Sequence, residues 1–224
     1  MIVRIGNAPR AAGTTVEEFQ THWSSGHADV ARQLPGLRSY LQNHAVLQDG
    51  LPLLPYPGFD ACSEIEFDSL QAMDDAFASE HFQEAVTADE QGFIDQSRFT
   101  NILAERRVVK AGAEPTDGVR LLSFWRVCPG ATPEQAAQLL ADAPVPDTVI
   151  LHEQLVEIPG AHDGRKPSIN QVVDILVFPT TDDALAHLQS IDSNMTIWSL
   201  GSIAQATGRL IGHVIPVVDR EGRI

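Results

Sequence analysis

His27 is the residue best placed for proton-transfer chemistry beside an apolar surface. It follows Phe19 by eight residues and Trp23 by four, which on a helix puts it at the edge of the apolar face. An imidazole has an ordinary pKa of about 6.5, so it can give or take a proton at neutral pH. The same spacing is typical of a structural histidine bonded to a carbonyl oxygen, and both interpretations stay open at this point.

A second polar row is predicted on the strand-like segment 37–47. Tyr40, Gln42 and His44 share one face of this strand, because successive side chains point to opposite faces. The other face is more apolar and should pack on helices, so the polar row should line the interior as a pocket wall. That apolar set is Leu37, Ser39, Leu41, Asn43, Ala45 and Leu47. A solvated row on an open sheet is the alternative.

The second half of the chain offers a similar pair on segment 147–158. His152 and Gln154 share one face of that strand. Aligning SYLQNHAV with VILHEQLV puts His152 opposite Gln42 and Gln154 opposite His44. The polar row is therefore predicted in both halves, with the two residue types exchanged.

Two carboxylates could take part in the same chemistry. Asp89 precedes Phe93 after a helical stretch, and it could either orient a histidine or cap the following turn, of which the cap is favoured. Glu64 lies in a strand between Ser63 and Ile65. A buried glutamate there would need a partner and could act as an acid–base group, whereas an exposed one would simply be solvated. The sequence does not choose between these two.

The spacing of residues in the sequence gives no support for a metal site, a nucleotide-binding loop or a serine nucleophile. His22 and His27 are five residues apart and diverge on a helix, and no zinc-type motif is present. There is no glycine-rich phosphate loop and no nucleophile elbow. Cys62 and Cys128 lie within strand patterns and are interpreted as small buried side chains.

The elements that must position these residues repeat one order twice. Strands are expected at 2–6, 37–47, 60–67 and 98–109, with helices at 16–34 and 69–88. After a flexible linker at 110–118, strands are expected at 119–127, 147–158, 170–178 and 209–218, with helices after Thr132 and within 181–206. Each half has the order β-α-β-β-α-β.

This order predicts an α+β fold made of two tandem ferredoxin-like repeats, one at 1–110 and a divergent one at 119–224. A four-stranded sheet with helices on one face leaves its other face bare, and that face must be covered. Two such sheets can cover each other, so we expect a pseudo-dimer like a dimeric α+β barrel, with a cavity, within one chain.

Composition limits the partners. The 224 residues carry a formal net charge of −15, which argues against nucleic acid and against an anionic membrane surface. No apolar run is long enough to span a bilayer, and residues 1–10 do not resemble a secretory signal. We therefore expect a soluble, cytoplasmic protein. A monomer is allowed, and a homodimer is possible through edge strands.

The first half also resembles the EthD domain family of the dimeric α+β barrel superfamily. The resemblance rests on TVEEFQTHWSSGHA (15–28), LPGLRSYLQNH (34–44), FDACSEIEFDS (59–69) and ADEQGFID (88–95). It implies a pocket between sheets and helices. Relatives are linked to xenobiotic degradation, and some fungal members act as dehydratases or decarboxylases on polyketide-derived aromatics. The second half lacks the Trp-to-His motif, so the resemblance does not imply a second equivalent site and leaves open whether the second half carries one.

Together these features favour a cofactor-independent lyase or isomerase acting on an aromatic, polyketide-derived or lactone substrate. His27 and His44 would move protons, and Tyr40 or Glu64 would polarise an oxygen. The substrate would contact Trp23, Gln42, Asp89 and His152. The alternatives are a haem-binding protein with a histidine axial ligand and a non-catalytic module that binds small ligands.

Overall fold

The computed structural model describes residues 1–54, 60–192 and 200–219, and these form two compact units. Of the described residues, unit 1 comprises 1–53, 60–103 and 214–219. Unit 2 comprises Leu54, 104–192 and 200–213. Two long strands therefore divide their residues between the units, and each unit is described by itself.

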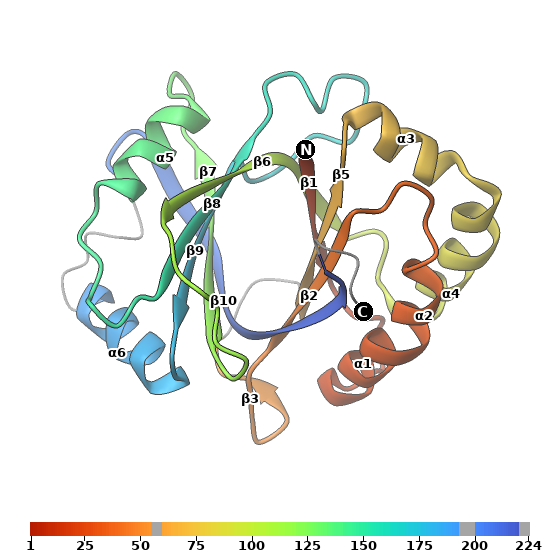
Figure 1. Ribbon diagram of the computed structural model, residues 1–224, viewed down its shortest axis with the longest axis horizontal. Helices are drawn as coiled ribbons and strands as arrows, with labels where there is room; N and C mark the ends of the chain where they lie inside the picture. Colours follow the sequence, from red (N-terminus) through yellow and green to blue (C-terminus); the bar gives the residue numbers. More distant parts are fainter. Residues whose placement is uncertain (55–59, 193–199, 220–224) are drawn as a thin grey trace. The chain divides into compact units, whose positions relative to one another are not determined.

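Unit 1 is a sheet with one layer of helices on it (Figure 1). Its elements in chain order are β1 (Ile2–Ala8), α1 (Val16–His22), η1 (Trp23–His27), α2 (Ala28–Ala31), β2 (Ser39–Ala45), the small hairpin β3 (Leu47–Gln48) and β4 (Leu51–Pro52), β5 (Ala61–Phe67), α3 (Leu70–Ala78), η2 (Phe82–Val86), α4 (Thr87–Phe93) and the start of β6 (Thr100–Lys110). The central strand β5 is flanked by β1 and β2, both antiparallel to it.

Unit 2 repeats this plan. Its elements are β7 (Val119–Val127), α5 (Pro133–Ala141), β8 (Leu151–Glu157), β9 (Val172–Phe178), α6 (Thr181–Asp192) and most of β10 (Ala204–Val218). Here β9 is flanked by β7 and β8, and β10 pairs with β7. The end of β6 pairs with β8 from Ala104 to Lys110. Both units thus have the ferredoxin-like order expected from the sequence.

Capping residues explain where two of the helices begin. The Thr15 hydroxyl accepts from the backbone N–H of Glu18, and the Glu18 carboxylate accepts from the backbone N–H of Thr15. The predicted capping box therefore precedes α1. Thr132 and Gln135 form the same box before α5, with Pro133 in its first turn. The helix expected at 69–88 is broken at Ser79, whose backbone is extended, and the helical path then runs on through η2 and α4 to Phe93. Of the helical pieces expected in 181–206, the structure describes α6 as far as Asp192, and residues 204–206 already belong to β10.

The helix expected at 16–34 contains a wide π-helical turn, η1, between α1 and α2. A wider turn holds more residues, so a four-residue step returns closer to the same face than in an α-helix. Trp23 and His27, at the two ends of η1, are both buried for this reason, and His27 is only 5% exposed. The feature that sets the direction of His27 is therefore a local departure from α-helical winding.

The predicted orientation of β2 is wrong. Tyr40, Gln42 and His44 do share a face, but that face is turned toward the helices: Gln42 donates to the carbonyl of Trp23, and His44 stacks on its ring. The opposite face of the sheet carries Ser39, Asn43 and Glu64, all buried. Both faces of this strand carry buried polar side chains. The rule that the more apolar face packs on the helices therefore does not apply to it.

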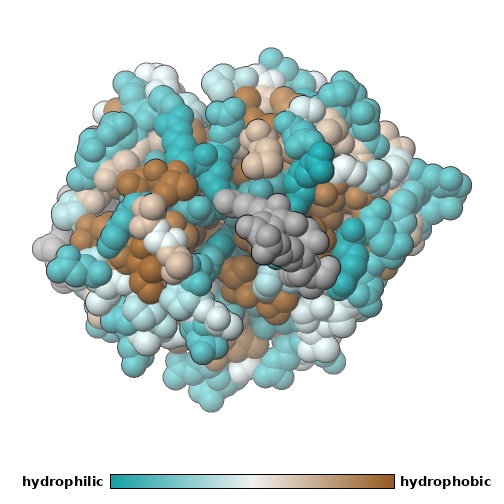
Figure 2. All heavy atoms as spheres, in the orientation of Figure 1, coloured by the Kyte–Doolittle hydropathy of each residue, from teal (hydrophilic) through white to brown (hydrophobic). Residues whose placement is uncertain are grey.

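Hydrophilic residues cover most of the outer surface seen in Figure 2, in keeping with the net charge of −15. In the part of the chain that the structure describes, no helix is long and apolar enough to cross a membrane.

Candidate active site

A pocket lies inside unit 1 between the helix-facing side of the sheet and the helical layer. Its volume is about 20 Å³, which is room for about one water molecule, so the side chains that line it lie close together. Its walls are largely apolar and aromatic, with a few polar groups that converge on the lumen. They include Arg4, Trp23, His27, Tyr40, Ser63 and Glu90.

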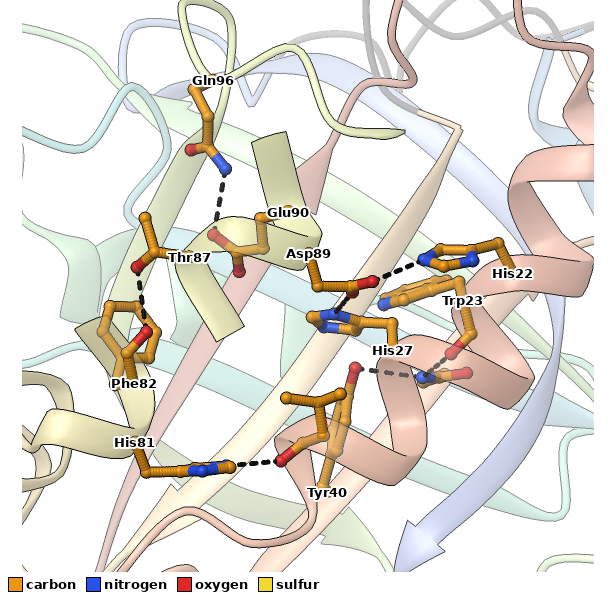
Figure 3. Close-up of polar contacts among 12 residues, drawn as sticks. His22, Trp23, His27, Tyr40, His81, Phe82, Thr87, Asp89, Glu90 and Gln96 are labelled. Atoms are coloured by element: carbon orange, nitrogen blue, oxygen red, sulfur yellow. Dashed lines mark hydrogen bonds and ion pairs between the residues drawn. The ribbon is translucent and has the colours of Figure 1, made fainter. Parts of the chain in front are cut away.

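His27 is held in the pocket wall by a carboxylate (Figure 3). Its Nδ1 lies 2.8 Å from Asp89 Oδ2, and Nε2 of His22 lies 2.8 Å from the other oxygen, Oδ1. His22 is the more exposed of the two histidines, and its ring packs on Phe93. One carboxylate from α4 therefore orients two imidazoles from the first helical segment.

This arrangement fixes the chemistry of the His27 ring. Partial burial disfavours the carboxylate of Asp89, but hydrogen bonds from His27 and His22 outweigh it and lower the pKa of Asp89 below its ordinary value. Asp89 is then ionised and accepts a proton-bearing nitrogen, so His27 carries its proton on Nδ1. Nε2, which has no partner among the described residues, is left as a proton acceptor.

Asp89 does not cap a helix, contrary to the favoured interpretation of the sequence. It lies within the first turn of α4, whose preceding residue, Val86, makes no side-chain cap. The carboxylate instead points to the histidines of another helical segment (Figure 3).

We expect Asp89→Asn to disturb the tautomer of His27. An amide can present either its oxygen or its NH₂ group to Nδ1, so the preference for a proton on Nδ1 should be lost or greatly reduced. Long-range ¹H–¹⁵N NMR correlations of the ring should show a single Nδ1–H form in the wild type and a mixture in the variant. A pure Nε2–H form in the wild type would contradict the assignment.

Tyr40 presents its hydroxyl to the same pocket through a chain of hydrogen bonds. His44 Nε2 lies 2.9 Å from Gln42 Oε1, and the amide nitrogen of Gln42 donates to the Tyr40 hydroxyl over 3.0 Å. The hydroxyl oxygen therefore accepts from Gln42 and keeps its own proton for another acceptor. Burial raises the pKa of Tyr40, so the group stays protonated and acts as a donor.

His44 lies outside the pocket and does not join His27 there. Its ring stacks on Trp23 with 5.0 Å between ring centroids, and burial lowers the pKa of His44 to about 4. A neutral His44 donates to Gln42 and so positions Tyr40. Gln42 likewise acts behind the wall rather than in it.

Three other residues predicted for the site have different surroundings. Glu64 lies on the opposite face of the sheet, where it accepts from Asn43 over 2.8 Å. Asp89 contacts histidines and does not line the pocket. His152 belongs to unit 2, where it bonds Asp174 over 2.7 Å. Trp23 alone of the predicted substrate contacts lines the pocket.

Strand register corrects the predicted correspondence between the halves. Gln42 faces Ser63 across the β2–β5 pair, and Gln154 faces Asp174 across the β8–β9 pair. Gln154 also donates to a helix carbonyl, that of Ala137, as Gln42 does to Trp23. Gln154 thus matches Gln42, which shifts the alignment by two residues, because the sequence comparison had no strand pairing to anchor it.

The same register leaves unit 2 without the main polar groups of the pocket. His152 faces Leu176 as Tyr40 faces Ile65, so His152 occupies the position of Tyr40. Leu121 also faces Leu176, as Arg4 faces Ile65, so Leu121 occupies the position of Arg4. No histidine stands in α5. At these positions unit 2 therefore has a leucine in place of Arg4, a histidine in place of Tyr40 and no histidine to match His27.

Sequence reasoning missed Arg4, Ser63 and Glu90, which all line the pocket. Arg4 had a detectable signal, because it is a lone charge within the apolar run IVRIG that opens the chain. A charge in a half-buried strand is expected to need a partner or a function. Glu90 and Ser63 had no such signal. Each stands beside a carboxylate that was itself a candidate for the site, Asp89 and Glu64 respectively.

The described residues offer no obvious holder for a metal or a haem. They contain no group of three or more His, Cys, Asp or Glu side chains arranged to hold a metal ion. Haem would need an imidazole nitrogen free to ligate and a flat space beside it. Nε2 of His27 meets the first requirement, but the narrow lumen does not meet the second.

Comparison with known proteins supports the resemblance found in the first half. A family model, the EthD domain, matches residues 11–97. An EthD family protein from Bacillus halodurans covers 47% of this chain and 98% of its own, with 20% identity and a TM-score of 0.37. Among curated proteins, none matches this sequence.

Two solved structures match over nearly the whole chain. An anthrone oxidase-like protein covers 100% of this chain and 95% of its own, with 11% identity and a TM-score of 0.61. A dye-decolorizing peroxidase from Bacteroides thetaiotaomicron covers 96% and 92%, with 7% identity and a TM-score of 0.51. At such low identity these likenesses concern the fold alone, and they confirm the predicted α+β class with tandem ferredoxin-like repeats.

Proposed function

We propose that the protein is a cofactor-independent enzyme of lyase or isomerase type, which moves a proton on a small aromatic, polyketide-derived or lactone substrate in the unit 1 pocket. The observation that carries this proposal is the His27–Asp89 pair, with Nε2 of His27 left free at the pocket. An imidazole oriented by a partly buried carboxylate, with its other nitrogen facing a cavity, is the arrangement of a general base.

The proposed step needs two groups of this chain. His27 Nε2 takes a proton from a carbon next to a carbonyl group, and the electron pair of the broken C–H bond moves toward the carbonyl oxygen. The Tyr40 hydroxyl donates to that oxygen as negative charge develops on it. The two rings meet edge to face with 6.5 Å between their centroids, so a carbonyl compound that widens the narrow lumen would contact both.

The surrounding apolar wall supports this chemistry. Trp23, Ile65, Phe77 and Phe82 line the pocket together with Val86 and Ile94. Aromatic and aliphatic walls favour a flat, apolar substrate and exclude water from the reacting groups, which strengthens their electrostatic interactions. A binding module would need the walls but not a histidine with a fixed tautomer.

Deuterium exchange tests the proposal without knowledge of the product. Hydroxyaryl ketones, aromatic β-diketones and unsaturated lactones would be incubated with the protein in D₂O, and deuterium at the activated carbon would be followed by mass spectrometry. We expect at least one compound class to exchange faster with protein than with buffer. Saturable binding across the panel without any protein-dependent exchange would favour the non-catalytic module instead.

A further inference from the structure

Arg4 places a cation in the wall of the pocket without a protein acceptor. Its side chain, from β1, lies between two aromatic rings, with the guanidinium carbon 4.8 Å from the centroid of Phe77 and 5.0 Å from that of Phe99. Among the described residues, none accepts a hydrogen bond from it or lies within ion-pair distance of it. The guanidinium is therefore fixed by stacking, while its N–H donors stay available.

Such a group is costly unless something pairs with it. Burial lowers the pKa of Arg4, while the negative charge of Glu90 and the neighbouring Tyr40 act in the opposite direction, and an arginine stays protonated throughout. Stacking on two rings offsets only part of the lost hydration. Glu90 lines the same pocket, but its carboxylate is held by Gln96 over 2.9 Å and forms no ion pair with Arg4.

Gly6 shows how closely the donors converge. A Cβ atom at this position would lie 2.9 Å from Ser63 Oγ, 2.9 Å from Phe99 Cζ and 3.4 Å from Arg4 Nη1. The absence of a side chain thus lets a hydroxyl and the guanidinium approach the same point on the strand surface. Ser63 Oγ has no hydrogen-bond partner within the described part of the chain, so both groups can bind one ligand.

We propose that the pocket selects substrates that carry a carboxylate on a flat apolar body, with the carboxylate bound by Arg4 and Ser63. This inference rests on the proposed function, since it names the substrate class of the same site. A planar guanidinium matches a carboxylate with two parallel hydrogen bonds. With the anion held at β1, the aromatic body would be placed among the apolar lining side chains, which must move apart to admit it because the pocket has room for about one water molecule.

Unit 2 provides the matched variant. Leu121 occupies the position of Arg4 in the same strand register, so Arg4→Leu installs a residue that this fold already accepts there. Arg4→Lys keeps the charge but removes the planar fork. Benzoate and its neutral isostere benzamide serve as probes, with affinity measured by NMR titration that follows the ring signals of His27.

We expect the wild type to bind benzoate saturably and at least tenfold more tightly than benzamide. Arg4→Leu should weaken benzoate about 10- to 100-fold and leave benzamide within about twofold, with Arg4→Lys between them. Equal affinity of the wild type for both probes, no saturable benzoate binding, or unchanged benzoate affinity in Arg4→Leu would each overturn the inference. Unfolding curves of both variants identify a folding defect, and Arg4→Lys then decides the outcome.

The two proposals fail in distinguishable ways. If benzoate binding depends on Arg4 but no carbonyl compound exchanges deuterium, the anion site stands and the enzymatic function falls. If exchange depends on His27 but proceeds equally well with neutral and carboxylated members of the panel, and Arg4→Leu leaves it unchanged, the function stands and the anion site falls.

Discussion

His27→Ala should reduce the rate of protein-dependent deuterium exchange by a factor of about 10² to 10⁴, the range over which a positioned general base usually contributes. The substitution removes the only described imidazole in the pocket wall and leaves Asp89 bonded to His22. The rate would be measured at neutral pH with the best substrate of the panel. Because alanine leaves space for a small base, added imidazole should restore part of the activity.

A histidine in the same unit serves as the control. Nε2 of His81 donates to the carbonyl oxygen of Val30 over 2.8 Å, and His81 does not line the pocket. His81→Gln should keep the wild-type rate, since glutamine can still donate to this carbonyl. If His27→Ala retains more than about a tenth of the rate while Glu90→Gln loses it, the base is Glu90 and the proposed role of His27 is wrong.

The order of the elements could be predicted because each follows from local chemistry. Thr15 and Glu18 define the start of α1, and Thr132, Pro133 and Gln135 that of α5. Strand β7 agrees with its predicted bounds, since VRLLSFWRV is a largely apolar run bounded by loops. The repeat followed from this order and needed no sequence identity between the halves.

The composition of the site depended on tertiary contacts that the sequence does not display. The pairing of Asp89 with His27 joins residues 62 positions apart, so spacing could not separate it from a helix cap. The orientation of β2 was mispredicted because the usual rule assumes one apolar face, whereas here Gln42 bonds a helix carbonyl and Glu64 bonds Asn43 on the other side. His27 and Tyr40 were found, whereas Arg4 needed the pocket itself to show its role.

His44 makes the stability of the protein depend on acid in a defined direction. Its pKa is about 4 in the folded protein, because burial disfavours the charged ring, and about 6.5 in an unfolded chain. Between these values the unfolded chain binds more protons than the folded one, so stability falls as pH falls. The stabilising contribution is complete above about pH 6.5 and is lost progressively down to about pH 4.

The expected loss from this residue is about 3 kcal/mol in the free energy of unfolding. His44→Gln keeps a donor for Gln42 but cannot titrate. Between pH 7 and pH 4 the free energy of unfolding should therefore fall by about 3 kcal/mol less in the variant than in the wild type. Denaturant unfolding at several pH values measures both curves, and their difference cancels the carboxylates that titrate in the same range. Parallel curves would mean that water reaches His44 and that its bond to Gln42, with the placement of Tyr40, is looser than 2.9 Å implies.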